Sequence, residues 1–149
     1  MKLEDEIKQK QFANNYHRLA LNIMFTSSWL ETIHGRGLRK YGITTQQYNV
    51  LRILRGQSPN AATVGLIQER MLDKNSNASR LIDKLLLKKL VSRKICPEDR
   101  RQMDVKITKK GLDLLTELDQ FQTEWTNSLK TISEAEAKLV SDLLDKLRG

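Results

Sequence analysis

Residues 73–111 read DKNSNASRLIDKLLLKKLVSRKICPEDRRQMDVKITKKG, and their pattern decides the fold. A polar turn at 73–75 leads into a helix that we expect at Ser76–Lys89. Its apolar residues recur at steps of three and four, which is the spacing of one buried helix face. They are Ala78, Leu81, Ile82, Leu85 and Leu86. After Leu90 the period changes to two, so a different kind of element follows the helix.

Two alternating segments predict a β-hairpin after this helix. Every second side chain recurs on one face at 91–95 (Val91, Arg93 and Ile95) and again at 103–107 (Met103, Val105 and Ile107). The two segments lie on both sides of the tip Cys96–Gln102. This alternation is typical of strands that bury one face. Because two strands alone are only marginally stable, we expect the hairpin to pack against the helices before it.

Two shorter helices are predicted directly before the polar turn. Thr44 and Gln47 have the spacing of a capping box, in which each side chain bonds the free backbone N–H of the other residue. The next helix is expected at about Thr63–Leu72, with Thr63 as its N-cap. The polar turn at 73–75 joins this helix to the helix expected at Ser76–Lys89. Two short helices joined in this way form a helix-turn-helix. With the hairpin added, the segment from Thr44 to Gly111 is predicted to be a winged helix-turn-helix with a two-stranded β wing.

Longer helices are expected on both sides of this segment, so the predicted fold class is mainly α. An apolar stripe from Phe12 to Ile33 predicts a first helix over Ile7–His34 that ends at Gly35, with Gly37 just beyond it. Thr108 is the expected cap of one C-terminal helix, and a capping box at 133–136 begins the last helix. The first helix is longer than a small core requires. We therefore expect residues 7–42 and 112–149 to be dimerisation helices within a single domain.

Composition narrows the class of protein further. The net charge is +8, and residues 84–110 hold ten Lys and Arg against three Asp and Glu. A basic excess concentrated in one short segment favours docking on a polyanion, whereas a well-solvated surface is the alternative. The single cysteine, Cys96, excludes an internal disulfide. With no apolar run of membrane-spanning length and no secretory pattern at the N-terminus, we expect a cytoplasmic protein without membrane contact.

The candidate DNA-contacting residues lie on the outward side of the helix after the polar turn. Short hydrogen-bonding side chains and two cations occupy these positions: Asn75, Ser76, Asn77, Ser79, Arg80 and Lys84. Such side chains can reach base edges in the major groove, where each base pair presents a different pattern of donors and acceptors. The alternative for 75–77 is that these residues merely cap and solubilise the start of a helix.

The hairpin tip adds Arg100 and Arg101 to the candidate site. A tip with two arginines can reach a phosphate backbone or the narrow minor groove, where negative potential concentrates. Asp99 is expected to brace a nearby guanidinium through a charge-assisted hydrogen bond. The alternative is a surface ion pair of at most about 1 kcal/mol.

Together these residues resemble the MarR family, the multiple antibiotic resistance regulators. The likeness runs from Thr44-Thr45-Gln46-Gln47-Tyr48 through the 73–76 turn and Ala78-Ser79-Arg80-Leu81 to Asp99-Arg100-Arg101, and it closes with Ile107-Thr108 and Gly111. The resemblance implies that the helix expected at Ser76–Lys89 is the recognition helix, that Arg101 enters the minor groove, and that Asp99 is its brace. It also implies a homodimer on a near-palindromic double-stranded DNA operator, with half-sites about 34 Å apart.

The resemblance further implies a transcriptional repressor that leaves DNA when a small aromatic or anionic effector binds. Seven side chains are candidates for an effector pocket, although none is singled out: Tyr16, His17, Trp29, Arg36, Arg39, Tyr41 and Tyr48. Leu90 stands where the family usually has a glycine, and leucine tolerates a positive φ poorly. We therefore expect a different helix-to-wing geometry at Leu90. Cys96 is expected to be an inert apolar residue at the base of the wing.

Two other classes of function compete with a DNA-binding regulator. A winged-helix module that binds protein is the alternative function, because a fold does not determine function. The strongly basic face of this chain argues against that alternative, because protein interfaces deplete lysine. An enzyme is rejected, because His17 and His34 have no carboxylate or nucleophile at catalytic spacing. The sequence has neither a Cys/His metal cluster nor a glycine-rich phosphate loop. We therefore expect no catalytic residue, no metal and no cofactor.

Overall fold

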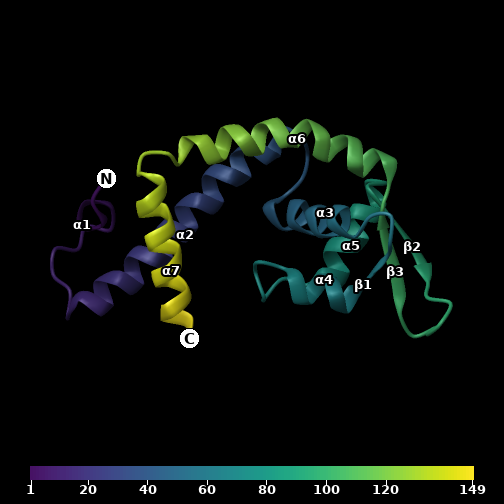
Figure 1. The fold of residues 1–149 in the computed structure, drawn as a ribbon, viewed down its shortest axis with the longest axis horizontal. Helices are drawn as coiled ribbons and strands as arrows, with labels where there is room; N and C mark the ends of the chain where they lie inside the picture. Colours follow the sequence, from purple (N-terminus) through teal and green to yellow (C-terminus); the bar gives the residue numbers. More distant parts are fainter.

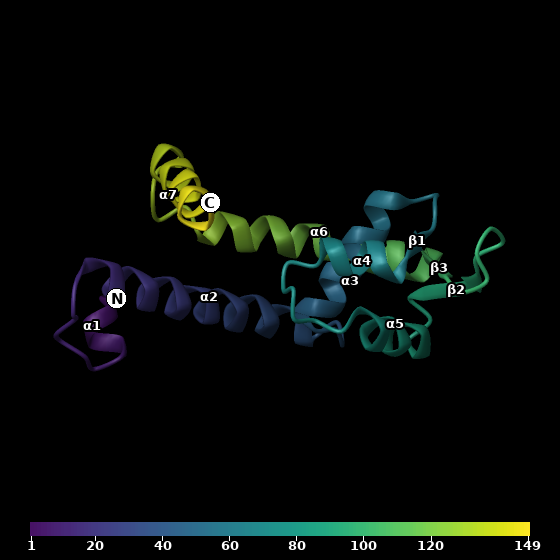
Figure 2. The same ribbon diagram turned by 90° about the horizontal axis from the view of Figure 1, so that it is seen from below.

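A computed structural model describes all 149 residues. The helices are α1 (Leu3–Glu6), α2 (Asn15–Arg39), α3 (Thr45–Gln57), α4 (Val64–Arg70), α5 (Ala78–Leu87), α6 (Lys109–Ser128) and α7 (Glu134–Arg148). The strands are β1 (Ala62–Thr63), β2 (Val91–Ile95) and β3 (Met103–Ile107). The chain is elongated, with α3, α4, α5 and the sheet at one end and α1 and α7 at the other; α2 and α6 connect the two ends (Figures 1 and 2). The predicted mainly helical, winged fold is confirmed.

The sheet has three strands in the order β1-β3-β2. β2 and β3 are antiparallel and pair along their full lengths, which confirms the predicted hairpin and its bounds. The predicted two-stranded wing gains a short third strand, because Ala62 pairs with Val105 and Thr63 pairs with Asp104. Since an isolated hairpin is marginal, this pairing fixes the base of the wing to the segment that starts α4.

One hydrophobic core lies between α3, α5, the base of the sheet and α6. Its largest fully buried side chains come from all of these elements and include Leu51, Leu54, Ile67, Ile82, Leu85, Val105, Leu115 and Leu118. Outside this core, Arg55 of α3 donates two hydrogen bonds to the Asp119 carboxylate of α6, at 2.8 and 2.9 Å. These bonds hold the pKa of Asp119 below its usual range. The middle of α6 is thereby fixed to α3.

The bounds predicted for the first helix are wrong at both ends. α2 begins after Asn14, whose side chain accepts a hydrogen bond from the backbone N–H of His17, and it continues to Arg39. Gly37, expected beyond the helix, lies inside it because the ring of Phe121 packs against its α-carbon. A Cβ at position 37 would lie 2.1 Å from this ring. The glycine therefore permits close packing of α2 on α6 and does not end the helix.

The end of α5 also differs from the prediction for Leu90. Lys89 N–H donates to Leu86 O at 2.9 Å, and Leu90 N–H donates to Leu85 O at 3.0 Å. This bond pattern is a Schellman motif, which requires a left-handed residue after the last helical one. Lys89 takes that conformation, with φ at 59°, while Leu90 is buried in the core. The expectation of a changed geometry because of leucine at position 90 is therefore wrong, since Leu90 supplies the apolar contact that accompanies the motif.

Four residues join the end of α5 to the start of α6, and we call them the Leu90 junction: Lys89, Leu90, Thr108 and Gly111. Thr108 donates its backbone N–H to Leu90 O at 3.1 Å and its hydroxyl to Lys89 O at 2.8 Å. The same hydroxyl oxygen caps α6 by accepting the Gly111 N–H at 3.1 Å. A Cβ at position 111 would lie 2.4 Å from Leu90 O. The junction therefore closes only with glycine at this position.

We expect Gly111→Ala to lower the free energy of unfolding by about 1–3 kcal/mol, because the added methyl group meets a backbone oxygen that cannot turn aside. Urea denaturation followed by circular dichroism, at one protein concentration, measures this change.

The matched control is Gly56→Ala, a second glycine in a helix. No atom lies within 4 Å of a Cβ at position 56, so this variant should gain up to about 1 kcal/mol from helix propensity. Equal effects of the two substitutions would contradict the close approach at the junction.

Candidate nucleic-acid interface

The exposed face of α5 carries four of the predicted site residues. Asn77 is the N-cap of the helix, and its side-chain oxygen accepts the backbone N–H of Arg80 at 3.0 Å. Asn77, Ser79, Arg80 and Lys84 are all exposed to solvent. The opposite side of α5 is buried against α3 and α4, so these four residues form one polar, cationic surface.

Asn75 and Ser76 lie in the turn before α5, although the sequence predicted that the helix begins at position 76. Two local bonds explain the difference: the Asp73 carboxylate accepts the Asn75 N–H at 2.9 Å, and Asp73 O accepts the Ser76 N–H at 3.1 Å. Such bonds satisfy the backbone in a turn and delay the helix. Asn75 is exposed, whereas the Ser76 hydroxyl is buried without a hydrogen-bond partner.

Side-chain amides from α3 and α4 hold this turn in place. Gln68 accepts the backbone N–H of Ala78 at 3.0 Å and donates to Lys74 O at 3.3 Å. Asn49 of α3 accepts the Leu72 N–H at 2.9 Å. The position of the first turn of α5 therefore depends on two amides, neither of which lies on α5 itself.

An ion pair joins the wing to α5. Arg93 of β2 donates to the Asp83 carboxylate of α5 at 2.9 Å. Asp83 is the only acidic residue of α5, so this pair neutralises the one negative charge of the helix. Arg80 and Lys84 then set the charge of its exposed face.

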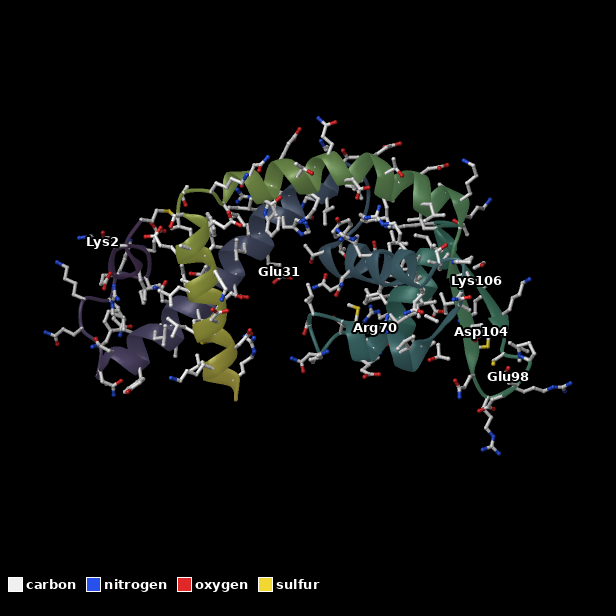
Figure 3. All side chains as sticks on the ribbon, viewed as in Figure 1. Lys2, Glu31, Arg70, Glu98, Asp104 and Lys106 are labelled. Carbon is white, nitrogen blue, oxygen red and sulfur yellow. The ribbon has the colours of Figure 1, made fainter.

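The tip of the wing presents Arg100 and Arg101 to solvent. The prediction that Asp99 braces a guanidinium is wrong, because its carboxylate accepts the backbone N–H of Arg101 at 3.0 Å and the side-chain amide of Gln102 at 3.3 Å. Backbone N–H groups two residues ahead are the usual partners of an Asp in a turn. Asp99 thus fixes the backbone of the tip, next to Glu98 at the far end of the hairpin (Figure 3).

The structure also contains a cavity of about 450 Å³ between the two ends of the molecule. Four elements or segments line it: α2, α3, the residues that follow α4, and α6. The lining residues are Ser27, Leu30, Glu31, His34, Thr45, Gln46, Asn49, Met71, Leu72, Asp73 and Trp125. None of the seven side chains proposed for an effector pocket is among them. Trp125 was not among the residues that the sequence pattern singled out for a site.

An aromatic cluster of His34, Tyr48, Phe121 and Trp125 borders this cavity. The ring centroid of His34 lies 4.7 Å from that of Trp125, 5.4 Å from that of Tyr48 and 5.6 Å from that of Phe121. Burial among these rings lowers the pKa of His34, so the imidazole is neutral at pH 7. The cluster joins α2, α3 and α6, which means that it connects the long helices to the winged end.

The structure contains neither a membrane-spanning helix nor a group of side chains that could bind a metal. No helix is both long enough and apolar enough to cross a membrane. No three His, Cys, Asp or Glu side chains are grouped so that they could hold a metal ion.

Comparison with known proteins shows which family this chain is similar to. Residues 41–102 match the model of the MarR family, and this segment runs from the approach to α3 to the tip of the wing. The HTH-type transcriptional regulator MhqR of Bacillus subtilis (strain 168) is 27% identical over 113 residues, which cover 74% of this chain and 75% of that protein.

Two solved structures share the fold over nearly the whole chain. A mutant MarR from E. coli complexed with operator DNA has a TM-score of 0.80 at 22% identity, covering 93% of this chain and 99% of that one. BpsR of Bordetella bronchiseptica, whose DNA binding is regulated by 6-hydroxynicotinic acid, has a TM-score of 0.78 at 23% identity, with coverages of 93% and 96%. The family model, the related sequence and the common fold together show that the chain has the winged-helix fold of MarR proteins and is similar to that family over residues 41–102.

Proposed function

We propose that this protein is a transcriptional regulator that binds specific sequences of double-stranded DNA, and that it acts as a homodimeric repressor released by a small ligand. The observation that carries the proposal is the joining of α5 to a basic wing through the Arg93–Asp83 pair and the Leu90 junction. Both exposed cationic surfaces are thereby presented at one end of the molecule. The likeness to MhqR and to the operator-bound MarR supports the same function.

In this proposal α5 is the recognition helix and enters the major groove. Ser79, Arg80 and Asn77 face outward at its first turn, where a helix contacts base edges. The Asn77 oxygen is occupied by the cap, so its amide N–H groups are the ones offered to bases. Lys84, one turn later, is placed for a phosphate, as is Asn75 before the helix. Ser76 contributes through the shape of the turn because its hydroxyl is buried.

The wing supplies contacts to the DNA backbone and the minor groove. Arg100 and Arg101 are exposed at the tip, and Asp99 fixes the backbone that carries them. The minor groove concentrates negative potential where it is narrow, and it attracts arginine there without hydrogen bonds that distinguish every base pair. Arg101 therefore adds affinity broadly, while the α5 residues distinguish between sequences.

Homodimerisation in this proposal uses the end of the molecule far from the wing. Four large apolar side chains on α7 are between 51% and 58% exposed in the single chain: Leu139, Val140, Leu143 and Leu147. On α2, Tyr16, Leu19 and Met24 are exposed as well. Contiguous apolar residues on paired long helices are typical of an interface between subunits. The cavity lies between this frame and the DNA-reading end, which suits a ligand that controls release.

We expect duplex binding to weaken steeply with added salt, and Arg101→Ala to lower affinity across all sequences because one phosphate contact is lost. Fluorescence anisotropy on a pool of 30-base-pair duplexes at several salt concentrations measures both effects. The slope of log affinity against log salt should fall by about one in the variant.

The matched control for this prediction is Lys130→Ala, because Lys130 is an exposed cation beyond α6, far from the wing. Its slope should equal that of the wild type. An unchanged slope in Arg101→Ala would remove the wing from the mechanism. Absence of binding to any duplex would sink DNA recognition and favour a protein-binding module.

We expect sedimentation equilibrium at micromolar concentration to give twice the chain mass of 17.2 kDa. Leu143→Glu should shift the protein toward the monomer, because it places a charge in the apolar face of α7. Leu87→Glu is the control, since Leu87 is also a solvent-exposed leucine, 85% exposed against 55% for Leu143, and lies at the opposite end. A monomeric wild type, or a dimer that Leu143→Glu leaves intact, is the result that contradicts the proposed interface.

A further inference from the structure

The cavity between α2, α3 and the segment after α4 has an acidic lining. Glu31 of α2 and Asp73 contribute carboxylates, and no lysine or arginine is among the lining residues. His34 adds no positive charge at neutral pH, because burial among the aromatic rings lowers its pKa. The charged side chains that line the cavity are therefore both carboxylates.

Neither carboxylate is neutralised by a cation elsewhere in the structure. Glu31 accepts hydrogen bonds from the side-chain amide of Gln46 at 3.2 Å and from the Thr45 hydroxyl at 3.4 Å. It extends from α2 into the space beside α3 (Figure 3). Asp73 accepts the backbone N–H of Asn75. Since all of these donors are uncharged, neither carboxylate is bonded to a cation, and an anion that enters the cavity meets repulsion from each.

Three apolar side chains from three parts of the chain also line the cavity: Leu30, Met71 and Trp125. The indole N–H of Trp125 is buried and has no hydrogen-bond partner. A buried donor without an acceptor is unusual and costly in a folded protein. The cavity therefore combines an aromatic side chain with two carboxylate acceptors.

We propose that this cavity binds a small aromatic compound that carries hydrogen-bond donors and no negative charge, and that it discriminates against aromatic anions. Donors on the compound bond to the carboxylates of Glu31 and Asp73, and its ring packs on Trp125. The assignment of this compound as an effector rests on the DNA-binding function proposed above, whereas its binding does not. Of the two effector classes that the family resemblance implied, aromatic and anionic, the lining selects the uncharged or cationic aromatic one.

The same lining residues connect the cavity to the DNA-reading surface. Gln46 and Asp73 line both the cavity and a second, shallower hollow that also contains Asn77 and Arg80. Asn49, another lining residue, holds the Leu72 N–H. A bound donor at Asp73 or Asn49 competes with the bonds that hold residues 71–77. The start of α5 then shifts, which changes the fit of the recognition helix to DNA.

Three probes of equal size test the charge preference: benzamidinium, benzamide and benzoate, with charges of +1, 0 and −1. They are titrated without DNA into the Trp29→Phe variant, in which Trp125 gives the only indole N–H signal in a ¹H–¹⁵N spectrum. Benzamide and benzamidinium should shift this signal, and benzoate should bind at least tenfold more weakly than benzamide, a difference of about 1.4 kcal/mol. Benzoate binding as tightly as benzamide, or no shift with any probe, would overturn the proposal.

A charge-removing substitution identifies the source of the preference. Glu31→Gln should strengthen benzoate binding at least threefold and weaken benzamidinium binding. Glu117→Gln, on the exposed surface of α6 outside the cavity, should change neither. Asp73→Asn provides the same test if Glu31→Gln does not fold. Unchanged relative affinities in a folded cavity variant overturn the proposal.

The readouts separate this proposal from the proposed function. Because the titrations contain no DNA, their failure leaves DNA recognition standing. Conversely, absence of duplex binding leaves the charge preference of the cavity intact and removes only its role in release. Adding benzamidinium to a protein–duplex complex then tests the connection between the two, and the proposal expects the duplex affinity to fall.

Discussion

The Leu90 junction is the contact on which the rest of the structure depends. Its parts come from the end of α5, the start of the wing and the first turn of α6, and they meet at a single backbone oxygen. Leu90 O accepts the Thr108 N–H and lies against Gly111, where any side chain would collide with it. Lys89 adopts a left-handed conformation so that Leu90 can turn into the core. The angle between helix and wing is therefore determined by backbone geometry, and surface charges refine it.

This constraint explains how a small domain holds the exposed face of α5 and the wing in one fixed orientation. The Arg93–Asp83 pair adds an electrostatic link between wing and helix, but an exposed ion pair contributes at most about 1 kcal/mol. We expect the Leu90 junction to contribute more to the link between wing and helix, because most of its groups are backbone atoms with buried neighbours. At the other end, α6 continues toward the apolar faces of α2 and α7. A shift at the aromatic cluster of His34, Tyr48, Phe121 and Trp125 can therefore be transmitted along α6 or through residues 71–77 to the start of α5.

Local patterns in the sequence predicted much of this fold, because they involve residues only a few positions apart. The capping boxes at 44–47 and 133–136 are present, and both wing strands have their predicted bounds. Gly37 was wrongly predicted to lie beyond the helix, because the side chain that requires a glycine at this position is Phe121, which is far away in sequence. A different geometry was expected at Leu90 because the sequence did not show that Lys89 takes the left-handed conformation while Leu90 is buried in the core. Asp99 was predicted to bond a guanidinium, but its carboxylate accepts the backbone N–H of Arg101, which is closer along the chain. The cavity could not be predicted, because its lining comes from separate parts of the chain between Ser27 and Trp125.

The central claim is that helix and wing act as one unit, and that two such units are set by a two-fold axis. Selection of bound duplexes from a random pool, followed by sequencing, tests this claim most directly. The account predicts enrichment of inverted half-sites with centres about 10 base pairs apart, or a multiple of one helical turn. Enrichment of a lone half-site, of direct repeats, or of no sequence at all would contradict it.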